Sequence, residues 1–153
     1  MRARLLVTLA ALLLVGLRGV SAQDDTVLAG IEDLEFVEWV TGPESPNQTD
    51  VRYDIDGTDL GSMFVQGDTL YIAFGDTFGC CRPSGGGAGG ANWRNNALAY
   101  SSDRDPEDGI TIDGMITEPD GTARAVLHRM RDDVTVIPTY GIAIGERLYL
   151  HYM

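Results

Sequence analysis

The sequence predicts an all-β protein built from antiparallel hairpins. After residue 22 there is almost no helical periodicity, and short β-branched and aromatic runs alternate with clusters of Gly, Pro, Asp and Asn, as is typical of all-β domains. One hairpin pattern occurs twice, because Val65–Phe74 and Ala143–Tyr152 share a Gly-acidic turn followed by Leu-Tyr-aliphatic-x-aromatic. Repeated units of this kind predict β-propeller blades. A sandwich with two similar hairpins is the alternative.

The N-terminal residues are predicted to be a secretory signal peptide. Two arginines precede an apolar run over Leu5–Leu17, and Val20–Ala22 offers small residues for cleavage,. The run is short for a membrane span, which needs roughly 20 apolar residues. We therefore expect residues 1–22 to be the signal peptide and residues 23–153 the domain. The expected location is secreted or extracellular, including the periplasm or cell wall, with no membrane anchor.

The charge of the chain restricts its partners. The formal net charge is −12 at pH 7, and the chain contains Arg but no Lys. Such a charge argues against binding to nucleic acid and to anionic membrane surfaces. A neutral or cationic partner fits better.

Seven runs bounded by turn residues are predicted to be strands. In order, they lie near Phe36–Val40, Gly61–Val65, Leu70–Phe74, Ala97–Ser101, Thr111–Ile116, Gly141–Ile144 and Arg147–Tyr152. The segment Gly42–Asp54 contains two prolines and is predicted to be a loop. The Gly-rich segment Ser84–Ala91 is predicted to be a flexible surface loop. It does not match a phosphate-binding loop, because it lacks the Lys-Ser/Thr ending,.

The second copy of the hairpin pattern ends near Met153. A propeller needs at least about four blades to close. We therefore expect this chain to cover only the N-terminal blades of a longer protein, as a truncated fragment.

The two cysteines, Cys80 and Cys81, are adjacent. In an exported protein they permit a vicinal disulfide, two free thiols, or pairing with cysteines outside this chain. Two cysteines without further ligands do not match a zinc site. No metal and no cofactor are expected.

Two carboxylates flank the first predicted hairpin. Asp59 precedes its first strand and Asp76 follows its second, so the reversal of the chain brings both to one end. Such a pair can serve as acid, base or nucleophile on a glycosidic bond. Two turn aspartates are the alternative.

Trp93, Arg94 and Asn96 directly precede the strand predicted at Ala97–Ser101. An exposed Trp can stack on a sugar, and Arg and Asn can bind hydroxyl groups. The alternative is a core Trp covered by the Arg. The acidic segment Asp103–Gly109 departs from calcium-loop spacing, and we expect a solvated turn there.

Several motifs occur in the order seen in a known family: Asp59–Gly61, Gly75–Gly79, Trp93–Ala99 and Asp105–Ile110. Through these motifs the chain, from about Thr58 to Met153, resembles the domain-of-unknown-function 4185 (DUF4185) family. Some members of that family are endo-D-arabinanases.

The resemblance implies a five-bladed β-propeller and a secreted glycoside hydrolase that cleaves inside arabinofuranose polymers. It implies Asp59 as nucleophile or base and Asp76 as general acid/base. It also implies Trp93, Arg94 and Asn96 as substrate contacts. The expected partner is therefore a polysaccharide. A non-catalytic propeller that binds carbohydrate or another surface is the alternative.

Overall fold

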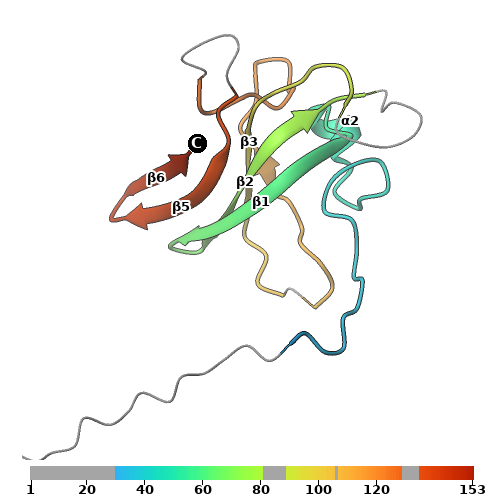
Figure 1. The fold of residues 1–153 in the computed structure, drawn as a ribbon, viewed down its shortest axis with the longest axis vertical. Helices are drawn as coiled ribbons and strands as arrows, with labels where there is room; N and C mark the ends of the chain where they lie inside the picture. Colours follow the sequence, from blue (N-terminus) through green and yellow to red (C-terminus); the bar gives the residue numbers. More distant parts are fainter. Residues whose placement is uncertain (1–29, 81–88, 106, 129–134) are drawn as a thin grey trace, which may run out of the picture. The chain divides into compact units, whose positions relative to one another are not determined.

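The computed structural model describes residues 30–80, 89–105, 107–128 and 135–153 (Figure 1). The predicted signal peptide, Cys81 and most of the Gly-rich segment lie outside these residues. The chain divides into two units, Met1–Leu34 and Glu35–Met153. Every helix and strand described below belongs to the second unit.

The described part of the second unit consists mostly of antiparallel strands. Its elements are α2 (Thr49–Tyr53), β1 (Gly57–Gln66), β2 (Thr69–Phe78), β3 (Ala97–Ser101), β4 (Gly114–Met115), β5 (Pro138–Ile144) and β6 (Arg147–Tyr152). One sheet has the order β1-β2-β3-β4, and β5 pairs with β6 in a second sheet. The all-β class is confirmed. The described strands form no closed sheet, and no described helix is long and apolar enough to cross a membrane.

Most predicted strands are confirmed. The strands predicted at Ala97–Ser101 and Arg147–Tyr152 are β3 and β6 with the same bounds. Three more, predicted at Gly61–Val65, Leu70–Phe74 and Gly141–Ile144, lie within β1, β2 and β5. Only β4 forms within the segment predicted at Thr111–Ile116. Another part of that segment bonds a side chain instead of a strand: the backbone N–H of Ile112 donates to Asn47 Oδ1 at 2.7 Å.

The strand predicted at Phe36–Val40 is wrong, because this segment pairs with no described strand. Its aromatic residues instead contact each other, with the rings of Phe36 and Trp39 edge to face at 5.3 Å. The carbonyl of Val40 accepts hydrogen bonds from the side chains of Ser45 and Asn47 rather than from a neighbouring strand.

The loop predicted over Gly42–Asp54 is wrong at its end, where α2 forms. The buried Thr49 hydroxyl accepts from the Gly42 N–H at 2.7 Å and donates to the Ile55 carbonyl at 3.0 Å. A five-residue helix is too short to be stable alone. We infer that these tertiary hydrogen bonds stabilise it.

The repeated sequence pattern forms two hairpins with equivalent turns. The turn between β1 and β2 is Gly67-Asp68, and the turn between β5 and β6 is Gly145-Glu146. Both glycines have positive φ, 58° and 59°, as two-residue hairpin turns of this kind require. The repeat seen in the sequence is therefore a repeat of structure.

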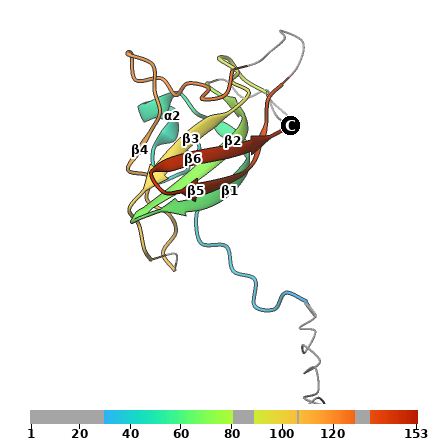
Figure 2. The same cartoon turned by 90° about the vertical axis from the view of Figure 1, so that its left-hand side faces the viewer.

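The β5–β6 hairpin lies against one face of the first sheet (Figures 1 and 2). Phe64 and Ala73 are buried on that face, and Leu148 and Leu150 of β6 pack against their cluster. Gly141 of β5 lies on the Phe64 ring so closely that a Cβ would overlap it. The interface between the hairpins is thus apolar and tightly packed.

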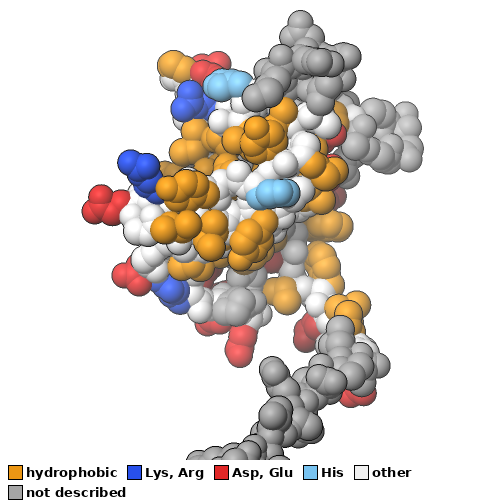
Figure 3. Space-filling view, turned by 60° about the vertical axis from the view of Figure 1, so that its left-hand side comes forward, with side chains coloured by type: hydrophobic (Ala, Val, Ile, Leu, Met, Phe, Trp, Pro, Cys, Tyr) orange, Lys and Arg blue, Asp and Glu red, His pale blue; other side chains and the backbone are white. Residues whose placement is uncertain are grey.

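The opposite face of the first sheet carries the larger apolar cluster, formed by Ile55, Ile72, Phe74, Ala97, Ala99, Ile112, Met115 and Ala123. The outward face of the β5–β6 hairpin is also apolar but exposed (Figure 3). Its exposed apolar residues are Tyr140, Ile142, Ile144 and Tyr149. The second hairpin therefore has one covered and one uncovered apolar face.

Candidate active site

Asp59 and Asp76 lie side by side where the pairing of β1 and β2 becomes irregular. The register runs regularly along the hairpin but shifts on both sides of Leu60, which has φ 59°. Asp59 therefore lies opposite the Gly75-Asp76 step of β2, and its carboxylate accepts a hydrogen bond from the Asp76 backbone N–H. The structure thus brings together the two aspartates singled out in the sequence, within the strands rather than outside them.

Gly75 in β2 and Gly79 directly after it leave space for two carboxylates. A Cβ at Gly75 would overlap Asp59 Oδ1, and a Cβ at Gly79 would overlap the Asp54 carboxylate. Because any other residue would displace these groups, the Gly75–Gly79 motif has a steric explanation. The glycine at each end of this motif lies against one acidic side chain.

The proximity of the two aspartates changes the acidity of Asp59. Burial of its carboxyl group, and then the charge of Asp76, raise the pKa of Asp59 above its ordinary value, because both disfavour the charged form. The hydrogen bond from the Asp76 N–H lowers the pKa and offsets part of this effect. Asp59 therefore holds its proton to a higher pH than an isolated aspartate.

Asp76 is held by two side chains from other parts of the chain. Trp93 Nε1 donates to Asp76 Oδ1 at 3.0 Å, and Thr135 Oγ1 donates to the same oxygen at 3.3 Å. Trp93 is 39% exposed. Sequence reasoning missed Thr135, because no motif surrounds it and only the fold brings it to Asp76.

Arg94 is buried behind this site, with 8% of its surface exposed. Its Nη2 donates to the Asp54 carbonyl at 2.6 Å, and its Nη1 lies 3.7 Å from Asp54 Oδ2. Burial lowers the pKa of the Arg94 guanidinium, and the Asp54 carboxylate opposes that shift. The guanidinium therefore faces the interior and Asp54.

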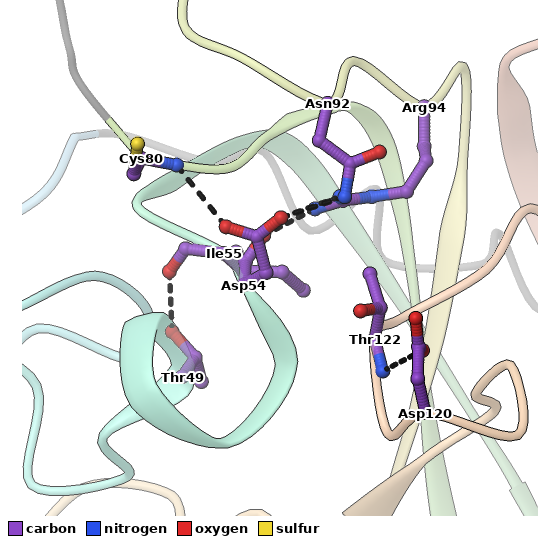
Figure 4. A network of polar contacts seen from close by, with 8 residues as sticks. All are labelled: Thr49, Asp54, Ile55, Cys80, Asn92, Arg94, Asp120 and Thr122. Atoms are coloured by element: carbon purple, nitrogen blue, oxygen red, sulfur yellow. Dashed lines mark hydrogen bonds and ion pairs between the residues drawn. The ribbon is translucent and has the colours of Figure 1, made fainter.

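The Asp54 carboxylate also accepts two hydrogen bonds (Figure 4). Asn92 Nδ2 donates to Asp54 Oδ2 at 2.6 Å, and the backbone N–H of Cys80 donates to Oδ1 at 3.2 Å. Cys80 is disulfide-bonded. Sequence reasoning also missed Asp54, although the positive φ values of Asp54 and Asn92, 55° and 50°, suit the Asp and Asn found there.

Asn96 is completely buried. Its Nδ2 donates to the carbonyls of Leu127 and Val136, and its Oδ1 accepts from the N–H groups of Val126 and Leu127, all at 2.8–3.1 Å. The amide therefore binds backbone in the interior. It connects β3 with the segment that carries Thr135.

The acidic segment Asp103–Gly109 includes a hydrogen-bonded turn. Asp103 Oδ1 accepts from the Asp105 N–H at 2.9 Å and Oδ2 accepts from the Thr111 N–H at 2.8 Å. These bonds lower the pKa of Asp103. Among the described residues, no group of three or more His, Cys, Asp or Glu side chains is arranged to hold a metal ion.

Comparison with protein families gives a match over most of the chain. The sequence model of the family described as "Domain of unknown function (DUF4185)" matches residues 44–153. This range covers more than half of the chain and contains every residue of the site described above. The comparison with curated proteins gives no match.

Proposed function

The chain belongs to the DUF4185 family, and on this premise we propose that it is a secreted glycoside hydrolase that cleaves inside arabinofuranose-containing polysaccharide. The observation that carries the proposal is the pairing of Asp59 with Asp76. Glycoside hydrolases use two carboxyl groups, one as general acid and one as nucleophile or base. The resemblance to endo-D-arabinanases suggests the sugar, and the signal-peptide pattern suggests secretion.

We assign the general acid to Asp59 and the nucleophile or base to Asp76. The raised pKa of Asp59 supports this choice, because a general acid must keep its proton near the working pH. Trp93 and Thr135 hold one oxygen of Asp76 in place. This assignment reverses the roles that the resemblance implies for the two aspartates.

Trp93 is the proposed substrate contact. Its indole is partly exposed and bonded to Asp76, so a sugar lying on it would be beside the reacting carboxylate. Arg94 and Asn96 are buried. We propose that both act indirectly, Arg94 by supporting the segment that carries Trp93 and Asn96 by supporting the segment that carries Thr135.

The packing of the hairpins supports the proposed β-propeller. In the repeat, Phe64 and Tyr71 of the first hairpin correspond to Ile142 and Tyr149 of the second. The first pair lies on the face that the second hairpin covers, whereas Ile142 and Tyr149, which pair with each other, are exposed. A further unit stacked in the same way would cover these two residues, as successive propeller blades do.

The function is tested with Asp59→Asn and Asp76→Asn. We expect each substitution to lower the release of oligosaccharides from D-arabinan by about 100-fold to 10,000-fold, because each removes a group that transfers a proton or attacks the sugar. Product release is measured as new reducing ends. Circular dichroism and thermal melting verify that the variants are folded.

Asp68→Asn is the matched control. Asp68 lies in the turn of the same hairpin, and its carboxylate pairs with Arg104 at the surface. The control removes one negative charge without touching the Asp59–Asp76 pair, so its activity should equal that of the wild type. Full activity in folded Asp76→Asn would contradict the proposal. Binding of arabinan without new reducing ends would favour the carbohydrate-binding alternative.

A further inference from the structure

Asp54 contacts both sequence neighbours of Trp93. Asn92 Nδ2 donates to Asp54 Oδ2 at 2.6 Å, and Arg94 Nη1 lies 3.7 Å from the same oxygen. Figure 4 shows the three side chains converging. The residues before and after Trp93 are thus both attached to the Asp54 carboxylate. This carboxylate lies against Gly79, directly after β2.

We propose that Asp54 is a positioning residue that holds the 92–94 segment so that the Trp93 indole donates to Asp76. The inference rests on the proposed function for its effect on activity. In the described part of the chain, no hydrogen bond or ion pair joins Asp54 directly to Asp59 or Asp76, so we infer that Asp54 acts on Asp76 through Trp93. Its carboxylate is therefore assigned no part in the chemical step.

The backbone around Trp93 explains why a side-chain clamp matters there. The N–H and carbonyl of Arg94 each pair with Thr77 at 2.8 Å, and Ala91 pairs in the same way with Gly79 and Cys80. The turn between these two fixed points includes Asn92 at φ 50°, a conformation that few residues adopt readily. The hydrogen bond from Asn92 to Asp54 attaches this turn to the end of α2.

The burial of Arg94 gives Asp54 a second effect. Within the described residues, Arg94 Nε and Nη1 have no hydrogen-bond partner, so the ion pair with Asp54 compensates the Nη1 charge. A buried charge that loses its partner is strongly unfavourable. Loss of the Asp54 charge should therefore displace the Arg94 guanidinium and weaken the hold on the turn that carries Trp93.

Fluorescence can follow Trp93 directly. The chain contains two tryptophans, Trp39 and Trp93, so Trp39→Phe leaves Trp93 as the single reporter. In this background we compare Asp54→Asn with the unmodified site. Asn keeps the size of the side chain and tolerates the positive φ at this position. We expect stronger acrylamide quenching of Trp93 and a kcat on D-arabinan lower by roughly 10-fold, since small misplacements of reacting groups are costly.

An exchange of the two partners provides the rescue. The double variant Asp54→Asn with Asn92→Asp again places one carboxylate beside one amide. It should restore the quenching of Trp93 and most of the activity, which a general loss of stability would not do. Asp68→Asn serves again as the matched control and should change neither readout.

The outcomes separate the two proposals. Increased quenching in Asp54→Asn that the exchange reverses supports the positioning role. Unchanged quenching in a cooperatively melting Asp54→Asn protein overturns it. If Asp54→Asn does not fold, Asn92→Gly decides by the same criterion, because Gly keeps the turn and removes the amide. If the wild type cleaves no arabinofuranose polymer, the proposed function fails while the quenching result still decides the role of Asp54.

Discussion

Single residues decide how the acidic groups of this site approach one another. Gly75 and Gly79 leave space for the carboxylates of Asp59 and Asp54. The result is a pair of neighbouring carboxyl groups, Asp59 and Asp76, of which Asp59 has a raised pKa. Keeping two carboxylates this close costs free energy in the charged state, and active sites commonly carry such a cost.

The raised pKa of Asp59 predicts the sign of a pH effect. The folded state binds the Asp59 proton more tightly than the unfolded state, so this group lowers stability as pH rises through the ordinary aspartate pKa, about 4, towards the raised value. Asp59→Asn removes that cost. We expect the variant to gain stability relative to wild type between pH 4 and pH 7, as measured by urea unfolding at each pH.

Asp103→Asn provides a control of opposite sign. The pKa of Asp103 is lowered by backbone hydrogen bonds, so its carboxylate stabilises the fold above the ordinary aspartate pKa, and this effect fades as pH falls through the lowered value. Asp103→Asn should therefore be less stable than wild type at pH 7, with a difference that shrinks in acid. The same direction of change for both variants would contradict the electrostatic account.

At the scale of elements, strands formed where the sequence supplied both an apolar pattern and a partner. The two hairpins satisfy this condition, since each partner lies across a two-residue turn. Phe36–Val40 has a strand-like composition but pairs with no strand among the described residues. In α2, Arg52 donates to the carbonyls of Asn47 and Ile112. A contact distant in sequence, from Arg52 to Ile112, therefore accompanies the unpredicted helix, whereas the Val40 carbonyl in the other segment is bonded to side chains a few residues away.

Asn96 is the side chain that joins β3 to the segment carrying Thr135. Asn96→Ala removes four hydrogen bonds and leaves their backbone partners in the interior. We expect a loss of about 3 kcal/mol in the free energy of unfolding. Asn95→Ala is the matched control: it removes the hydrogen bond from Asn95 to the Val136 carbonyl, at 3.3 Å, and should cost about 1 kcal/mol. Equal small losses would show that Asn96 does not support this segment.

At the scale of the whole molecule, the recurring feature is the stacking of one hairpin on another. The interface buries Phe64 against the second hairpin, and Gly141 lies directly against the Phe64 ring. The repeat places comparable apolar residues on the outward face of the second hairpin. This asymmetry, with one face covered and one uncovered, is the physical basis for proposing further units.

Gly141→Val tests the stacking. Valine favours strands, but its side chain would meet the Phe64 ring, and overpacking of this kind costs about 1–3 kcal/mol. We expect that loss in urea unfolding. Ile142→Val, on the exposed face of the same strand, should stay within about 0.5 kcal/mol of wild type. A neutral Gly141→Val would argue against close packing of the two hairpins.

The sequence alone determined the all-β class, both hairpins and the proximity of Asp59 and Asp76, because each depends on local pattern and on short chain reversals. Only the tertiary structure decided which groups surround that pair. Thr135 and Asp54 reach the site through contacts between segments distant in sequence. It also placed Arg94 and Asn96 inside. Burial and long-range hydrogen bonding depend on how segments pack, and no local pattern records that.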